Sequence, residues 1–416
     1  MEEDKLIYID DYEITENSQC IITFEVVDEK ALISIENGEF LNINSLEVNL
    51  DLVSPEELDN WNNTFVYFDK FDLVQNGFAN AQKGGNKTNA RKLNNIFRKL
   101  KEEMSRFVLN SIEEPNGDIN NLNKHWFYCV LNVGRGESNL VITPNGKLYL
   151  FDGGDSKQKV SQKITNVVNH INCFPSFSIE DQISGVFISH PDNDHFRGVV
   201  DVLDTHSLSQ DCFIYYNYHG HYPKPNWVTA LKKIKQSLTS NKLNHIVHIP
   251  EKKDLSDLSA LLPYLYFSTA WPYDIGKNIS KINGYNVNDS SHCFYVGQSQ
   301  SSLVFNLFGD IEKKGWEING DLPYASLNNG FIFKPSHHGR KSGDPKVNFS
   351  GISTVNSHID SKMKKTSIFP NYVSSANDNV GHLYSSLAEK ATLSTSTSNA
   401  IIYIIGSKGP IFMWQV

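Results

Sequence analysis

From about residue 126 onward, apolar runs typical of strands alternate with segments that carry apolar side chains at helical spacing. The helical segments are 158–170 and 227–238, and the strand-like runs are WFYCVLNV, KLYLFD, GVFIS, LVFNLFG and FIFKP. Strands that alternate with helices are typical of an α/β layered domain. The final segment, NAIIYIIGSKGPIFMW, has two apolar runs around Ser407-Lys408-Gly409 and is predicted to be a hairpin.

The first 125 residues follow a different pattern. CIITFEVV (20–27) and ALISI (31–35) are short apolar runs typical of strands, and a turn-prone Asn37-Gly38 follows them, so residues 1–80 are predicted to be a β-rich unit. Helical spacing of apolar residues predicts an amphipathic helix over about 89–113, and 113–123 is predicted to be a linker. We therefore expect three parts: 1–80, 81–125 and 126–416.

Composition excludes several classes of protein. Hydrophobic residues make up 39% of the 416 residues, and there are 26 glycines, which is normal for a globular chain and excludes a disordered or fibrous one. No run approaches the ~18 apolar residues of a membrane span, and the acidic N-terminal segment lacks the pattern of a secretory signal. The five cysteines are scattered and form no CxxC pair. These features predict a cytoplasmic protein with no membrane partner.

The net charge of −9 argues, as a total, against a nucleic-acid partner. Residues 1–80, however, hold 19 acidic side chains and 3 lysines, a balance of 3 − 19 = −16, which leaves −9 + 16 = +7 for residues 81–416. Residues 83–101 hold seven basic side chains and no acid. They form either the solvated face of a packed helix or a surface for phosphates or an acidic partner. The acidic unit is expected to bind a basic partner or to shield a nucleic-acid groove.

The most informative segment is SHPDNDH (189–195), which directly follows the apolar run 186–188. A strand that ends there would project His190, Asp192 and Asp194 from a tight turn, with His195 beginning the next element. Two imidazoles and two carboxylates so close together suit one or two divalent cations of borderline hardness, such as Zn or Mn. The alternative is a helix N-cap with a surface cluster.

Three further strand-like runs end in residues that bind metals. Asp152 closes KLYLFDGG, Asp310 closes SSLVFNLFGD, and His337-His338 follow FIFKPS. Open α/β sheets bind ligands at the carboxyl ends of their strands. The joint pattern therefore favours a metal centre over a capping cluster.

In combination these motifs resemble a known family. HPDNDH resembles the metallo-β-lactamase fold signature HxHxDH, in the variant HxDxDH of the ComEC-like competence nuclease domain. NVGRGESNLVITPNGKLYLFDGG, SSLVFNLFGDIE, FKPSHHGRKSG and SSANDNVGHLYSSL are similar to four more of its motifs, in the same order, over about residues 126–416. The resemblance implies an α/β fold, the metallo-β-lactamase αββα sandwich, and a metal-dependent hydrolase. The sequence departs from the family pattern at Asn132, Arg135, Glu137 and Leu383.

The resemblance also implies a set of ligands for two divalent metal ions, Zn or Mn, with Mg a further candidate. One ion would be held by His190 and Asp192, the second by Asp194, His195 and either His337 or His338, and Asp310 would bridge them. His337 is favoured because it lies nearer the strand. Asp152 would orient the turn from behind, and His292 is an additional candidate ligand.

Other residues are implied to act on a substrate. Arg340, Lys341 and Ser342 lie next to the histidine pair and are interpreted as phosphate-binding groups or, alternatively, as a solvated loop. His382 is positioned by the motif to protonate a leaving oxygen, or it simply precedes a helix at 383–391. The candidate catalytic residues are Asp194, His338, Lys341 and His382.

The first hypothesis is therefore a metal-dependent phosphodiesterase, specifically a nuclease with DNA as the favoured substrate. Such a protein would suit a soluble effector of a bacterial defence or mobile-element system, regulated by a partner protein through residues 1–125. The second hypothesis is a hydrolase of a lactone, thioester or amide, against which HxDxDH and the basic HHGRKS segment count. The third is a regulatory or sensing protein, which the filled ligand positions make less suitable.

Overall fold

The computed structural model gives a described structure for a defined part of the chain. The described residues are 5–14, 19–49, 64–68, 81–83, 88–109, 125–133, 136–155, 159–175, 177–216, 224–247, 266–271, 287–299, 302–312, 315, 327–332, 334, 336–337, 372–374, 392–394, 400–406 and 409–416. The chain divides into two compact units. Unit 1 is Met1–Arg106 with Tyr222–Gln236, and unit 2 is Phe107–His221 with Ser237–Val416. This division differs from the predicted ranges of 1–80, 81–125 and 126–416.

Unit 1 contains an antiparallel five-stranded sheet with the order β3-β2-β1-β4-β5. The sheet buries alternate apolar side chains such as Ile7, Ile22 and Val66. Its strands are β1 (Lys5–Ile14), β2 (Gln19–Val26), β3 (Asn44–Asn49), β4 (Phe65–Phe68) and β5 (Ala81–Lys83).

Residues 31–35, which were predicted to be a strand, lie in helix α1 (Glu29–Asn37). The prediction was wrong because both ends of the segment carry helix caps. Asp28 accepts a hydrogen bond from the backbone N–H of Ala31 at 2.7 Å, and Gly38 ends the helix with φ 78°. The Asn37-Gly38 pair therefore terminates a helix rather than a strand.

Helix α3 (Thr88–Met104) confirms the amphipathic pattern of the basic segment but ends earlier than predicted. Leu93, Leu100 and Met104 form its buried stripe. A 3-10 turn (η1, Ser105–Phe107) and the short strand β6 (Val108–Leu109) follow it.

Unit 1 is completed by a segment from the middle of the chain, helix α6 (Pro225–Thr239), of which residues up to 236 belong to it. Asn226 accepts from the backbone N–H of Leu41 at 2.6 Å and donates to the Leu41 carbonyl at 3.2 Å. The Asn226 backbone N–H donates to Glu25 at 3.1 Å, and the Lys224 ammonium is 3.4 Å from Asp10. Because these groups are buried, removal of residues 1–80 would leave Lys224 and Asn226 without their partners.

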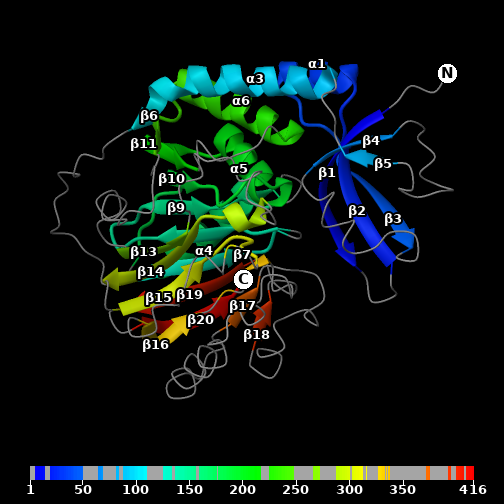
Figure 1. The fold of residues 1–416 in the computed structure, drawn as a ribbon. Helices are drawn as coiled ribbons and strands as arrows, with labels where there is room; N and C mark the ends of the chain where they lie inside the picture. The colour runs from blue at the N-terminus through cyan, green and yellow to red at the C-terminus, as the bar shows by residue number, and fades with distance from the viewer. Residues whose placement is uncertain are drawn as a thin grey trace. The chain divides into compact units, whose positions relative to one another are not determined.

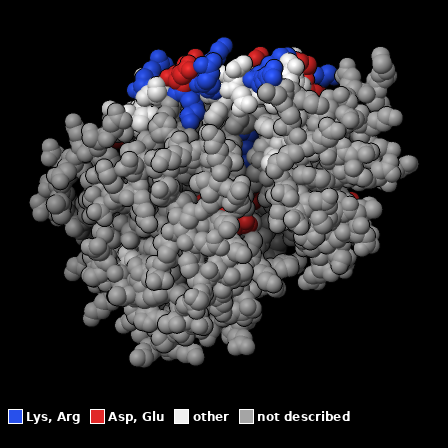
Figure 2. Space-filling view, in the orientation of Figure 1, with Lys and Arg blue, Asp and Glu red and all other residues white. Residues whose placement is uncertain are grey.

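The surface of unit 1 carries mixed charge over α1 and α3. Figure 2 shows Lys and Arg side chains with Asp and Glu among them. Lys92 is 2.7 Å from Glu29, and Arg98 is 3.3 Å from Glu102. Exposed pairs of this kind contribute little to stability. They do lower the net positive charge of the helix face, which favours the interpretation of α3 as a packed helix with a solvated face.

Unit 2 is built on a nine-stranded sheet with the order β20-β19-β7-β8-β9-β10-β11-β12-β6 and a four-stranded sheet with the order β13-β14-β15-β16 (Figure 1). The strands from β9 to β6 run parallel, and the others of the large sheet are antiparallel. A two-stranded parallel sheet, β17 with β18, lies apart from both. The strands are β7 (Trp126–Leu131), β8 (Asn139–Ile142), β9 (Leu148–Phe151), β10 (Ile183–Phe187), β11 (Leu208–Tyr215), β12 (His245–Val247), β13 (Tyr266–Trp271), β14 (Cys293–Ser299), β15 (Ser302–Leu307), β16 (Leu327–Ile332), β17 (Tyr372–Ser374), β18 (Thr392–Ser394), β19 (Ala400–Gly406) and β20 (Gly409–Gln415).

The two large sheets enclose one apolar core that is rich in aromatic rings. Tyr128 of β7 stacks on Phe305 of β15 with ring centroids 4.1 Å apart, and Phe151 stacks on Phe187 at 4.2 Å. Helices α4 (Val160–Asn172) and α5 (Asn193–Thr205) pack against each other, and α4 packs against β7. The predicted α/β sandwich is therefore confirmed.

Several smaller predictions are also confirmed. The C-terminal runs form the antiparallel hairpin β19–β20, and the helical segments 158–170 and 227–238 lie in α4 and α6. The helix predicted at 383–391 lies outside the described residues. Among the helices that the structure describes, none combines the length and the apolar character that crossing a bilayer requires.

Candidate metal centre

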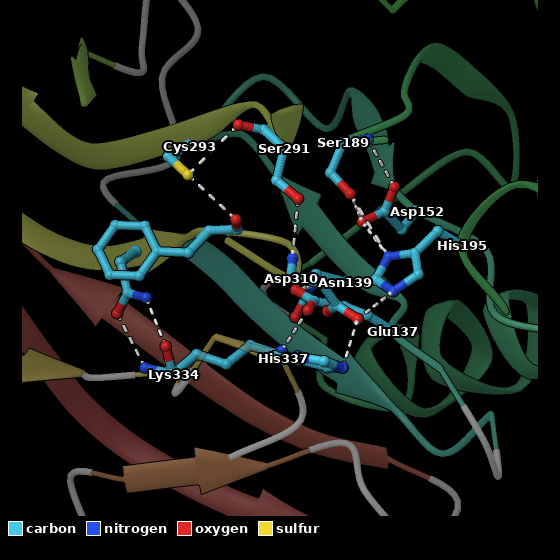
Figure 3. Close-up of polar contacts among 12 residues, drawn as sticks. Glu137, Asn139, Asp152, Ser189, His195, Ser291, Cys293, Asp310, Lys334 and His337 are labelled. Carbon is cyan, nitrogen blue, oxygen red and sulfur yellow. Dashed lines mark hydrogen bonds and ion pairs between the residues drawn. The ribbon is translucent and has the colours of Figure 1, made fainter. Parts of the chain in front are cut away.

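Side chains from the ends of four strands converge on one site in unit 2 (Figure 3). Asp152 follows β9, the segment 189–195 follows β10 and begins α5, Asp310 follows β15, and His337 follows β16. Three of the predicted ligands, His190, His195 and Asp310, each offer a buried donor atom, and these atoms lie within 4.8 Å of one another. The structure thus brings together residues that are up to 120 positions apart in the sequence.

One oxygen of Asp310 lies between two imidazole rings. Its Oδ2 is 3.2 Å from Nε2 of His195 and 3.8 Å from Nε2 of His337. A second carboxylate–imidazole pair lies beside it, because Nε2 of His190 is 3.2 Å from Oδ2 of Asp192. These five residues are all buried.

The donor set and its spacing fit a divalent cation. Two ligand atoms that are each ~2.1 Å from a tetrahedral ion lie ~3.4 Å apart, close to the separations around Asp310. Burial lowers the pKa of His195, but the carboxylates of Asp310 and Asp152 outweigh it and raise that pKa well above its usual value. In the absence of metal a proton therefore neutralises a position that a cation would occupy.

Asp152 holds the turn after β10 from behind. Its carboxylate accepts from the backbone N–H and from the hydroxyl of Ser189, both at 2.7 Å, and it is 2.9 Å from Nδ1 of His195. Asp152 itself adopts φ 56°, which is unusual for a residue with a side chain and is found mainly at functional sites. This is the position that the predicted orienting carboxylate requires.

The backbone of Asp194 is clamped by the loop between β7 and β8. Glu137 donates its backbone N–H to the Asp194 carbonyl at 3.2 Å. Gly136 has φ 101°, and a Cβ at that position would lie 2.0 Å from the same carbonyl oxygen, so only glycine fits. Asp194, in the first turn of α5, is less buried than the other candidate ligands that the structure describes.

A buried ion pair lies behind the site and was missed in the sequence. Lys334 Nζ is 2.5 Å from Glu137 Oε2, and the two side chains are 2% and 1% exposed. Asn139 donates to Oε1 of Glu137 at 2.7 Å and accepts from the hydroxyl of Tyr128 at 3.1 Å. Asn306 anchors the backbone of Lys334 through two hydrogen bonds, at 2.6 and 2.8 Å. The network connects the segment that precedes His337 to the loop that clamps Asp194.

His292, the additional candidate ligand, is buried beside the site but does not belong to the cluster of His190, His195 and Asp310. Its Nδ1 lies 2.8 Å from the hydroxyl of Tyr215, and its backbone N–H donates to the carbonyl of Ser189 at 2.9 Å. Whether His292 binds a metal stays a prediction.

The remaining predicted residues lie outside the described part of the chain. They are Arg135, His338, Arg340, Lys341, Ser342 and His382. Of the histidine pair, the structure describes His337 and places it beside Asp310. The sequence pattern also gave no role to Glu312, whose carboxylate lies 2.6 Å from Nδ1 of His337.

No family model matches the sequence, and no curated protein sequence matches it either. Two solved structures resemble the fold weakly. The metallo-β-lactamase FIM-1 from Pseudomonas aeruginosa, in its mono-zinc form, is 13% identical with a TM-score of 0.23, and the match covers 44% of this chain and 64% of that one. A long-form RNase Z from yeast is 12% identical with a TM-score of 0.31, and the match covers 65% of this chain and 41% of that one. At these scores neither likeness carries an argument, so the description of the site rests on its own geometry.

Proposed function

We propose that this protein is a metal-dependent phosphodiesterase, most specifically a nuclease that cleaves DNA. The observation that carries the proposal is the buried cluster of His190, His195 and Asp310 at the strand ends, with Asp192 and His337 adjoining it. A group of imidazoles and carboxylates so completely removed from water is costly unless a cation or protons compensate it.

Two divalent ions, Zn or Mn with Mg as a further candidate, are assigned to the ligands predicted from the sequence. His190 and Asp192 would hold one ion, Asp194, His195 and His337 the other, and Asp310 would bridge them. Such ions supply Lewis acidity that lowers the pKa of water and neutralises charge on an attacked phosphodiester.

The remaining residues of the site orient these ligands and keep water from them. Asp152 and Ser189 fix the His195 ring and the turn that follows β10. The ion pair of Glu137 and Lys334 fixes the loop behind Asp194. Preorganised ligands of this kind need little rearrangement during reaction, and loss of such supporting contacts typically costs 10- to 100-fold in metal affinity or activity.

The choice of a phosphodiester rests on the motif HxDxDH and on the basic segment after His337. Cations next to a metal centre favour an anionic substrate. The balance of +7 in residues 81–416 permits a nucleic-acid groove. We further propose that the protein is a soluble effector of a defence or mobile-element system, and that a regulatory partner binds within residues 1–125.

The test is incubation of the purified full chain with linear and circular DNA, RNA and cyclic dinucleotides, with Mn, Zn, Mg or EDTA. We expect cleavage of DNA that depends on the divalent ion and stops with EDTA. Lactone, thioester and amide substrates serve as the comparison set. Metal-dependent hydrolysis of one of these, without cleavage of any phosphodiester, would show that the substrate class is wrong.

A further inference from the structure

Glu312 lies two residues after Asp310 and contacts the ring nitrogen of His337 that faces away from Asp310. Its Oε1 is 2.6 Å from Nδ1 of His337, while Nε2 of the same ring lies 3.8 Å from Oδ2 of Asp310. The imidazole of His337 therefore has a carboxylate at each of its nitrogens. The His337 side chain is 6% exposed and that of Glu312 is 17% exposed, so water competes little for this contact.

His195 has the same arrangement on the other side of Asp310. Its Nδ1 is 2.9 Å from Asp152, and its Nε2 is 3.2 Å from Oδ2 of Asp310. Two imidazoles thus face one carboxylate oxygen, and each is backed by a second carboxylate. In a neutral imidazole, a carboxylate that accepts the Nδ1–H leaves the lone pair on Nε2, which makes Nε2 the atom that binds a metal.

The segment that carries Glu312 is held firmly in place. The backbone N–H of Asp310 donates to the hydroxyl of Ser291 at 3.0 Å, and Ile311 is completely buried. Gly315 then donates its backbone N–H to Asp289 at 2.7 Å. Because the chain is anchored on both sides of Glu312, the position of its carboxylate is fixed relative to Asp310.

The backbone of His337 is fixed to the same segment. Its N–H donates to the carbonyl of Gly309 at 3.1 Å, and its φ of 47° lies in the left-handed region, which costs free energy in a residue with a side chain. His337 is thus held at three points by residues 309–312. A side chain that only filled space would not require this arrangement.

We propose that Glu312 is a positioning residue that selects the Nδ1–H tautomer of His337 and aims its Nε2 at the ion shared with Asp310. This proposal rests on the metal centre of the proposed function, but it concerns the affinity for the ion and not the reaction. Glu312 acts through His337 and does not itself touch the ion.

The test is a titration of the metal-free full chain with Mn²⁺ or Zn²⁺ in a calorimeter, for the wild type and for Glu312→Leu. We expect about 10- to 100-fold weaker binding of one ion, the effect typical of losing a supporting carboxylate. Glu312→Gln keeps an acceptor oxygen but loses the charge, and it should lie between the two. Glu180→Leu, at an exposed glutamate of the same unit, is the matched control and should bind as the wild type does.

A double variant separates positioning from a general structural effect. If Glu312 acts through His337, Glu312→Leu should weaken binding no further in a His337→Ala background. An additive loss in the double variant would overturn the proposal, and so would wild-type affinity in Glu312→Leu. Ion binding without cleavage of any phosphodiester would contradict the proposed function and leave the role of Glu312 intact, whereas a wild type that binds no ion would contradict both.

Discussion

Replacement of Asp310 by asparagine is expected to abolish metal-dependent cleavage, with a fall in rate of at least ~10³-fold. Asp310 Oδ2 faces Nε2 of both His195 and His337, so it is the one described oxygen that the two rings share. The asparagine side chain has almost the same shape but no negative charge, and it should hold a cation poorly. The backbone N–H of Asp310 would keep its bond to Ser291.

The measurement is the rate of cleavage of linear DNA at saturating Mn²⁺, together with the thermal unfolding of the metal-free protein. Asp211→Asn is the control, because Asp211 is an exposed aspartate of the same unit. We expect the control to cleave like the wild type. If Asp310→Asn also retained most of the wild-type rate, the metal site would have been assigned to the wrong residues.

Replacement of Lys334 by methionine is expected to destabilise unit 2 by about 3–5 kcal/mol, because it leaves the Glu137 carboxylate buried without its cation. The two side chains are nearly completely buried and their charged atoms are 2.5 Å apart. Methionine fills a similar volume, so the loss would come mainly from the unpaired charge. The backbone bonds between Lys334 and Asn306 would persist.

Urea unfolding of the metal-free variants measures this effect. The double variant Lys334→Met with Glu137→Gln removes both charges and should recover at least ~2 kcal/mol of the loss, since a buried pair that is replaced as a whole is often tolerated. A single variant that loses less than ~1 kcal/mol would show that the Glu137 carboxylate is solvated or protonated. A double variant less stable than Lys334→Met would show that the pair contributes more than its charges.

The strands and the ligands at their ends could be predicted because both depend on local sequence. β9, β10 and β15 are apolar runs that end in Asp152, in the segment 189–195 and in Asp310. Parallel and neighbouring strands then bring these ends to one edge. The apolar run 31–35 shows the limit of this argument, since composition suggested a strand while the Asp28 and Gly38 caps produce a helix.

The supporting contacts could not be predicted, because each joins residues that are far apart in the sequence. Glu137 pairs with Lys334 across 197 positions, and nothing near either residue indicates its partner. A lysine inside an apolar run, as in FIFKP, is a weak signal of a buried acid elsewhere. The contribution of residues 222–236 to unit 1 was missed for the same reason, because α6 has an ordinary amphipathic pattern and its buried Asn226 binds Leu41 and Glu25.

The most direct test of the central claim is the hydrolysis of bis(p-nitrophenyl) phosphate, a simple phosphodiester that has no base or sugar. The rate is measured for the full chain after removal of metal with EDTA and again after Mn²⁺ or Zn²⁺ is restored, for the wild type and for Asp310→Asn. We predict no release of p-nitrophenol without metal, recovery when the ion returns, and no recovery in Asp310→Asn. Hydrolysis that survives complete removal of metal, or that Asp310→Asn performs as well as the wild type, would contradict the proposed metal centre.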